Sequence, residues 1–153
     1  MSDVQSIDDL MGAIGPAMRL GEVRAYPEQG AWALIFDEDR IVFAERDGED
    51  GRLWLSSEIA PPPPGAGRLA LLERMMMVTG LWRETGGYRL ALDGAGEHLL
   101  LGCDVRADDL SLDGFTTVLG NFVDALAAWR QIVAAAGAGK AAEPRPGEGA
   151  IRA

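Results

Sequence analysis

Few residues in this chain have the types and spacing needed for acid–base or nucleophilic chemistry. His98 is the only histidine and Cys103 the only cysteine among 153 residues. A serine or cysteine nucleophile needs a base beside it, and His98 would have to serve every candidate. A single cysteine forms neither an intramolecular disulfide nor a cysteine metal cage. The sequence therefore predicts no enzyme, no metal site and no cofactor, and a deep polar pocket around His98 would be needed to reverse that reading.

Two stretches resemble ligand-binding loops but lack residues that those loops need. In 134–141, Ala134 replaces the first glycine of a phosphate-binding loop, and Ala141 replaces the Ser or Thr that reaches magnesium. In 47–58, acidic residues fall at three calcium-ligand positions, but Arg52 occupies the sixth position, where an EF-hand needs glycine. We therefore interpret the first as the end of a helix and the second as a turn followed by a strand.

The charge of the chain excludes several classes of partner. Asp and Glu total 24, Lys and Arg total 14, and the net charge is −10. Such a chain repels phosphate backbones and anionic membranes, so we expect neither nucleic-acid binding nor membrane insertion. No apolar run approaches the roughly 20 residues that cross a bilayer, and the acidic N-terminus lacks a signal-peptide pattern. We expect a cytoplasmic protein, for which a basic or polar peptide would be a suitable partner.

Helical and strand periodicities alternate along the chain. Apolar residues recur at helical spacing over 7–18, with Ser6 as the N-cap, and Gly15-Pro16 should kink or interrupt this helix. Short β-branched and aromatic runs then predict three strands, at 31–36, 40–45 and 52–59. After the prolines 61–64, the patterns predict a helix at 67–79, strands at 87–92 and 97–105, and a helix from Ser111 to about Gly137.

This order of elements predicts the fold class. Helix, three strands, helix, two strands, helix is typical of an α+β fold with a mainly antiparallel twisted sheet. We expect a single domain over 1–137 and a flexible C-terminal tail over 138–153, because the tail has little apolar surface to bury.

The strands and the second helix carry more apolar surface than one small domain can cover. Residues 31–36 contain no polar side chain, and 41–44 are apolar on both sides of the strand. In the second helix, Met75, Met76 and Met77 point in three directions, because a helix turns by roughly 100° per residue. Methionine is flexible and tolerates varied partners. We therefore expect a second subunit to cover the methionines that the chain's own core cannot reach.

Three stretches resemble a known family. They are "LLERMMMVTG", "YRLALDGAGEHLLLGCDV" and "LSLDGFTTVLGNFVDALAAWRQIV". They are similar to the apolar second helix, the hairpin and the closing aromatic–Trp helix of the class I type III secretion chaperones, the Tir-chaperone (CesT-like) family. The resemblance runs from about Ile7 to Val133. Many members have Asn in the second helix, where this chain has Met75 to Met77.

The resemblance implies a type III secretion chaperone-like homodimer. It implies binding, without ATP, to the N-terminal segment of a secreted effector, which wraps around the dimer as an extended chain and stays competent for export. The secretion ATPase is a further partner that the resemblance suggests. The alternative is a regulatory adaptor on the same fold, which binds a transcriptional regulator or its antagonist.

Two sets of site residues follow from the apolar surplus and the resemblance. For the partner-binding surface, the resemblance indicates the first helix and the first three strands, and we expect the aromatic and aliphatic anchors Trp32, Leu34, Phe36, Ile41, Phe43 and Trp54. The sequence leaves a second assignment open, in which these six form the core and Ile35, Val42 and Leu53 face outward. For the dimer interface we expect Leu71, Met75, Val78 and Leu90.

Overall fold

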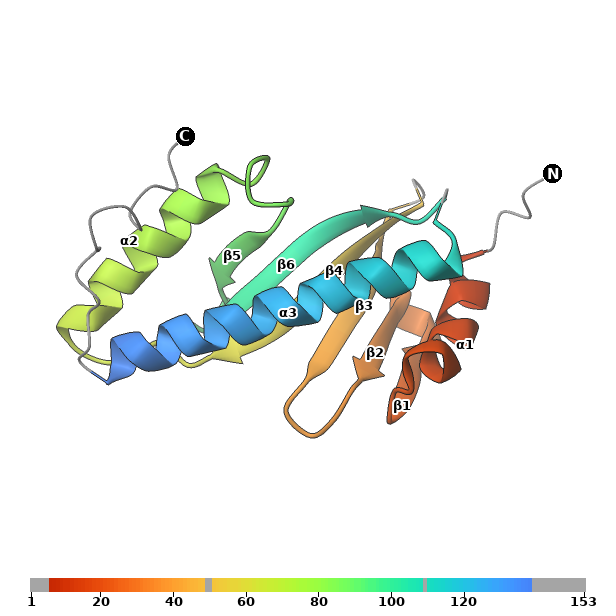
Figure 1. Ribbon diagram of the computed structural model, residues 1–153, viewed down its shortest axis with the longest axis horizontal. Coiled ribbons are helices and arrows are strands. Elements are labelled where there is room, and N and C mark those ends of the chain that lie inside the picture. Colours follow the sequence, from red (N-terminus) through yellow and green to blue (C-terminus); the bar gives the residue numbers. More distant parts are fainter. Residues whose placement is uncertain (1–5, 49–50, 109, 139–153) are drawn as a thin grey trace. The chain divides into compact units, whose positions relative to one another are not determined.

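A computed structural model describes residues 6–48, 51–108 and 110–138 of the chain (Figure 1). Its elements are α1 (Ile7–Met18), β1 (Glu22–Tyr26), a 3-10 turn (Pro27–Gln29), β2 (Ala31–Ile35), β3 (Ile41–Asp47), β4 (Arg52–Ala60), α2 (Ala66–Gly80), β5 (Arg89–Leu92), β6 (Leu99–Arg106) and α3 (Leu112–Gly137). The strands form one sheet in the order β1-β2-β3-β4-β6-β5. The α+β prediction with an antiparallel sheet is confirmed, but the sheet gains a sixth strand, β1, that was not predicted.

The chain divides into two compact units. Unit 1 combines residues 1–57 with 102–125, and unit 2 combines 58–101 with 126–153. Three elements, β4, β6 and α3, contribute residues to both units. The predicted tail, 138–153, lies outside the described residues apart from Ala138.

Helix α1 begins after its predicted Ser6 cap and covers the residues 7–18 that carry the helical pattern. The Ser6 hydroxyl accepts a hydrogen bond from the Asp9 amide, and the Asp9 carboxylate accepts one from the Ser6 amide, which completes a capping box. Gly15-Pro16 was predicted to kink or interrupt this helix, and interruption is wrong, since α1 continues to Met18. Pro16 lies in the last turn, where its missing donor removes only one hydrogen bond of the helix.

In unit 1, strand register assigns the side chains to two faces of the sheet. Directly paired residues share a face, and the pairings of β1 to β4 join one set that lies toward α1. This set, the helix face, comprises Val23, Ala25, Trp32, Leu34, Val42, Ala44, Leu53 and Leu55. Helices α1 and α3 lie on the same side of these strands (Figure 1). The opposite face carries Tyr26, Ala31, Ala33, Ile35, Ile41, Phe43 and Trp54.

The helix face forms the core of unit 1. On it, Leu34, Val42, Ala44, Leu53 and Leu55 are all fully buried. From the helices, Leu10 and Ile14 of α1 and Phe115, Leu119 and Phe122 of α3 are also fully buried. The apolar residues of α3 in this unit therefore form part of its core.

In unit 2, helix α2 is attached to β5. The Thr79 hydroxyl accepts a hydrogen bond from the Leu90 amide at 2.9 Å and donates one to the Leu90 carbonyl at 3.1 Å. At the end of α3, the Arg130 guanidinium donates to the carbonyls of Glu58 and Ile59, at 3.0 and 3.1 Å. The Thr79–Leu90 bonds attach one side of α2 to β5, and the Arg130 bonds join α3 to the end of β4. Within the described residues, no helix is long and apolar enough to cross a membrane.

Candidate functional site

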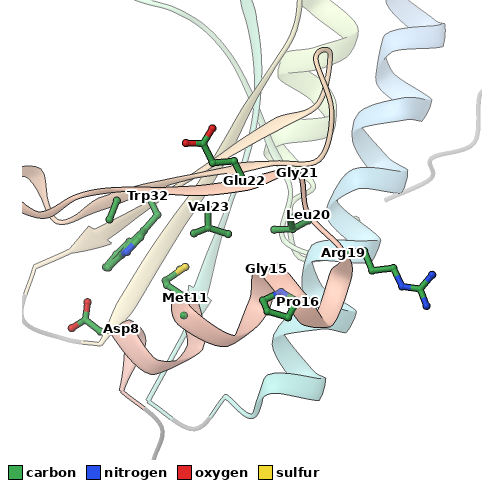
Figure 2. A pocket seen from close by; sticks show the side chains of 12 residues that line it. Asp8, Met11, Gly15, Pro16, Arg19, Leu20, Gly21, Glu22, Val23 and Trp32 are labelled. Carbon is green, nitrogen blue, oxygen red and sulfur yellow. The ribbon is translucent and has the colours of Figure 1, made fainter.

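A cleft in unit 1 lies between α1 and the edge strand β1. Its volume is about 750 Å³. Met11, Gly12, Gly15 and Pro16 line it from the helix, and Val23 and Ala25 line it from the strand; Asp8, Arg19, Leu20, Gly21, Glu22 and Trp32 complete the lining. Figure 2 shows these side chains, with Met11 and Val23 in the middle of the cleft and Trp32 toward the end where Asp8 lies. The site is an apolar trough, which suits side chains of a peptide better than a small polar substrate.

Strand β1 gives the cleft an edge that can pair with another chain. It is the outermost strand, hydrogen-bonded to β2 on one side, and no described strand pairs with its other side. An edge strand presents a row of unpaired N–H and C=O groups, onto which an extended peptide can add. The cleft thus places apolar pockets beside a free main-chain edge.

Sequence reasoning missed this strand. Residues 22–26, "EVRAY", alternate charged and apolar side chains, and Val23 and Ala25 face the cleft. The alternation was the available signal. It is only five residues long and begins soon after a helix, so it is weaker than the aromatic runs that follow.

Two acidic side chains that line the cleft have an arginine partner. Asp8 accepts a hydrogen bond from the Arg46 guanidinium at 2.8 Å. Glu22 accepts two from Arg24, at 2.9 and 3.1 Å, and these raise the pKa of the Arg24 guanidinium. Both acidic side chains of the lining are therefore paired with an arginine at the exposed rim of the cleft.

The Arg46 side chain also covers the aromatic ring at one end of the cleft. Its guanidinium lies 5.3 Å from the centre of the Trp32 ring, within the range of a cation–π contact. The same guanidinium reaches Asp8 of α1. Arg46 therefore joins the first turn of α1 to Trp32, which is 7% exposed.

The six predicted anchor residues do not share one face. Trp32 and Leu34 lie on the helix face, and of the six only Trp32 lines the cleft. Ile41, Phe43 and Trp54 lie on the opposite face, where Phe43 is 42% exposed. The Trp54 ring lies against the backbone of Gly102 in β6, where a Cβ would collide with it. The six therefore stay a prediction for cargo binding, but they belong to two surfaces.

The structure also places Phe36, the remaining anchor, and the three residues that the alternative assignment placed outward. Phe36 follows β2 and is half-buried beside the Arg40 guanidinium, which lies 5.9 Å from its ring centre. The alternative that placed Val42 and Leu53 outward is wrong, since both are fully buried on the helix face. Only Ile35, half-buried, lies on the opposite face as that assignment required. Strand alternation alone does not say which face the helices cover.

The four residues predicted at the dimer interface are buried within their own chain. Leu71, Met75, Val78 and Leu90 are between 3% and 7% exposed in unit 2. The exposed apolar side chains of α2 are on its other side: Leu69, Met76 and Met77, at 65%, 75% and 70%. We name these three the exposed α2 stripe. The helix is two-sided, as its sequence suggested, and this stripe is the apolar surface that a second subunit can reach.

His98 and Cys103 lie away from the cleft. The two ring nitrogens of His98 face carboxylates, Asp93 at 3.2 Å and Glu58 at 3.4 Å, in unit 2. Cys103 is buried in unit 1, and this burial raises the pKa of its thiol to about 12. A thiol with so high a pKa is a poor nucleophile. Neither residue lines the apolar cleft.

Comparisons with solved structures show the fold. One chain of the ExsC–ExsE complex matches with a TM-score of 0.71 at 18% identity, over 87% of this chain and 97% of that one. A chain of the HopA1–SchA chaperone–effector complex matches at 0.63 and 15% identity, over 81% and 92%. The Yersinia pestis type III secretion chaperone SycH, solved with a fragment of YscM2, matches at 0.56 and 21% identity, over 78% and 96%.

The family is shown by the sequence. A search of curated protein sequences found no match. The model of the Tir chaperone protein (CesT) family matches residues 24–130, which is well over half of the 153-residue chain. The matched region begins in β1 and ends in α3. This chain belongs to the Tir chaperone protein (CesT) family.

Proposed function

We propose that this chain is a cytoplasmic chaperone that holds the N-terminal segment of a type III secreted effector in an extended, export-competent form. Membership of the CesT family supports the chaperone class. The solved HopA1–SchA chaperone–effector complex and the SycH–YscM2 complex show that proteins of this fold bind other proteins. The observation that carries the proposal for this chain is the apolar cleft beside the unpaired edge of β1.

The cleft and the edge strand bind different parts of an extended segment. The main chain of the segment pairs with the free edge of β1, and its apolar side chains enter the cleft over Met11, Val23 and Trp32. Main-chain pairing tolerates many sequences, whereas the cleft selects large apolar side chains. Burying two such side chains contributes roughly 3 to 6 kcal/mol before the ordering of the segment is subtracted.

This mode of binding requires neither catalysis nor ATP. Each buried apolar group and each main-chain hydrogen bond favours the extended segment over the free one, so binding alone keeps the segment from folding. Handover to the secretion ATPase is the step at which this binding has to be reversed. The role belongs in the cytoplasm, where an effector awaits export.

We also propose a homodimer that forms through the exposed α2 stripe. The described residues of unit 1 include 13 acidic and six basic side chains, a net of −7, whereas those of unit 2 include five of each. Two copies can therefore meet through unit 2 without charge repulsion. The stripe of Leu69, Met76 and Met77 supplies the apolar contact.

A substitution at Gly12 tests the cleft as the cargo site. Gly12 lines the cleft, and a Cβ at this position meets no atom within 4 Å, so Gly12→Arg fills the cleft without a clash in the chain. The matched control is Gly120→Arg in α3, where a Cβ also meets no atom within 4 Å and which does not line the cleft. Both substitutions replace a helical glycine, so both should preserve or slightly raise stability.

The assay is capture of proteins from the lysate of the secreting strain, followed by mass spectrometry. We expect wild type and Gly120→Arg to capture the same secreted protein, and Gly12→Arg to lose it while remaining folded by circular dichroism. If Gly12→Arg captures the same protein at the wild-type level, the cleft is not the cargo site. Capture of a transcriptional regulator or its antagonist in place of a secreted protein would favour the adaptor role.

A further inference from the structure

We propose that Arg19 binds a carboxylate of the cargo segment and thereby sets the register and direction of that segment in the cleft. The inference rests on the proposed function, because it concerns the segment that occupies the α1–β1 cleft. It adds a requirement on the sequence of the cargo: an Asp or Glu at a fixed distance from the apolar side chains that enter the cleft.

Arg19 is the charged residue of the cleft that lacks a counter-ion. Among the described lining residues, the charged side chains are Asp8, Glu22 and Arg19. Asp8 is paired with Arg46, and Glu22 is paired with Arg24. No hydrogen bond or ion pair joins the Arg19 side chain to any residue in the described part of the chain. Among the described residues, the cleft thus offers one charge without a partner, and it is positive.

The backbone at Arg19 is one that glycine would adopt more easily. Arg19 has φ 54° and ψ 47°, and it is the only described non-glycine residue with a positive φ. Its amide donates to the carbonyls of Gly15 and Pro16, as at a helix end where glycine is the usual residue. A cation near a helix C-terminus gains only a small benefit from the helix dipole. Strain of this kind is retained where the side chain has a function.

The place of Arg19 in the cleft fits a role in orienting a peptide. Figure 2 shows Arg19 at the opposite end of the cleft from Asp8, with its side chain extending outward beyond Pro16 and Leu20. The two residues are separated by 11 positions of helix, or about 16 Å. An extended peptide covers that length in about five residues. A carboxylate over Arg19 therefore lies about five residues from the side chain at the Asp8 end.

The charge of unit 1 makes this single arginine selective. A carboxylate on the cargo is repelled by the net −7 of the unit's described residues wherever no arginine is free to receive it. Beside Arg19 it forms a charge-assisted hydrogen bond. The same peptide bound in reverse, or shifted by two residues along β1, places its carboxylate away from that partner. Arg19 thus discriminates between registers that main-chain pairing alone would accept.

The test is a selection of random 12-residue peptides displayed on phage against the full chain. Three baits are used: wild type, Arg19→Asn and Arg52→Gln. Asn tolerates the left-handed backbone, so Arg19→Asn removes the charge and keeps the turn. Arg52 is an exposed arginine of the same unit outside the cleft, and it controls for the change in net charge.

We expect wild type and Arg52→Gln to enrich peptides with Asp or Glu at one fixed offset from apolar residues, and Arg19→Asn to enrich apolar peptides without it. Fluorescence anisotropy with one enriched peptide then measures the coupling energy between Arg19 and the acidic residue of the peptide. Replacing its Asp or Glu by the amide should weaken binding to wild type about tenfold and should leave binding to Arg19→Asn unchanged.

Each failure has a separate meaning. If the enriched peptides bind in the cleft but have no Asp or Glu at a fixed position, the role of Arg19 is wrong and the proposed function still stands. An equal effect of the amide peptide on wild type and Arg19→Asn would also overturn that role. If wild type binds no peptide in the cleft, the proposed function and the inference both fail.

Discussion

Leu34 and Phe43 lie on adjacent strands and face opposite sides of the sheet. Leu34 is fully buried on the helix face, between Val23 of β1 and Val42 of β3 in the register. Phe43 is 42% exposed on the opposite face. Both are large apolar residues in apolar runs, and their types alone do not distinguish a core residue from a contact residue.

An Asp substitution should destabilise the fold much more at the buried Leu34 than at the exposed Phe43. Leu34→Asp places a charge in the core and should lower the free energy of unfolding by roughly 3 to 5 kcal/mol or abolish folding. Phe43→Asp should lower it by about 1 kcal/mol or less, since its carboxylate remains hydrated. Urea titration followed by tryptophan fluorescence measures both. A stable, folded Leu34→Asp variant would show that the helix face is not the core of unit 1.

Arg19 should be a residue whose loss stabilises the fold. Glycine adopts φ 54° without steric strain, so Arg19→Gly should raise the free energy of unfolding by about 0.5 to 1 kcal/mol. Arg52→Gly, at an ordinary strand position, is the control and should lower it. Thermal unfolding of the two variants provides the comparison. If Arg19→Gly is less stable than wild type by a similar amount, its side chain stabilises the folded chain and the strain argument is wrong.

Among the elements, α2 has apolar residues on two sides, and one of these sides is buried within its own chain. Leu71, Met75 and Val78 are buried, and hydrogen bonds between Thr79 and Leu90 attach this side to β5. The exposed α2 stripe points elsewhere. The run of three methionines thus serves both a core and a surface, which is possible because successive helical residues point about 100° apart.

A carboxylate placed on either side of α2 should distinguish the two roles. Met76→Glu should convert a dimer into a folded monomer of about the 16.3 kDa chain mass, because it puts an unpaired charge into the proposed interface. Met75→Glu should unfold unit 2, because Met75 is 3% exposed within the chain. Light scattering after size exclusion and circular dichroism measure mass and folding. A dimeric Met76→Glu variant would mean that another surface holds the two chains together.

The elements that the sequence predicted best are those with long or aromatic apolar patterns. The helix predicted from Ser111 to about Gly137 agrees with α3, and the Ser6 cap predicted the start of α1. Strand β1 was missed because a short, half-exposed edge strand has a weak pattern and is stabilised by pairing with β2. Pro16 was expected to interrupt α1, but a proline in the last turn costs little.

For the whole molecule, the net charge of −10 is unevenly distributed between the units. Nearly all of the excess acidic residues belong to unit 1, which also holds the cleft. Composition predicted an acidic protein that avoids nucleic acid and membranes. The division of charge required the fold, because unit 1 is assembled from two segments of the chain that are 44 residues apart in sequence.

The cleft lies in the region that the resemblance indicated for the cargo surface, and the six predicted anchors stay an untested prediction. The resemblance indicated the first helix and the neighbouring strands, and the cleft lies between α1 and β1. Of the six anchors, Trp32 alone lines it, because register and the position of the helices decide which side chains face α1. Met11, Val23 and Arg19 were not predicted, since none is distinguished by residue type.

The most direct test of the account is amide hydrogen exchange of the chain with and without the cargo segment that wild type captures. We predict strong protection of the β1 amides, residues 22–26, and of the α1 residues that line the cleft, because the segment pairs with the edge strand and covers the trough. Exchange in the exposed α2 stripe should be unchanged by cargo. Protection confined to α2 and β5, with β1 exchanging at its free rate, would contradict the central claim that the α1–β1 cleft is the cargo site.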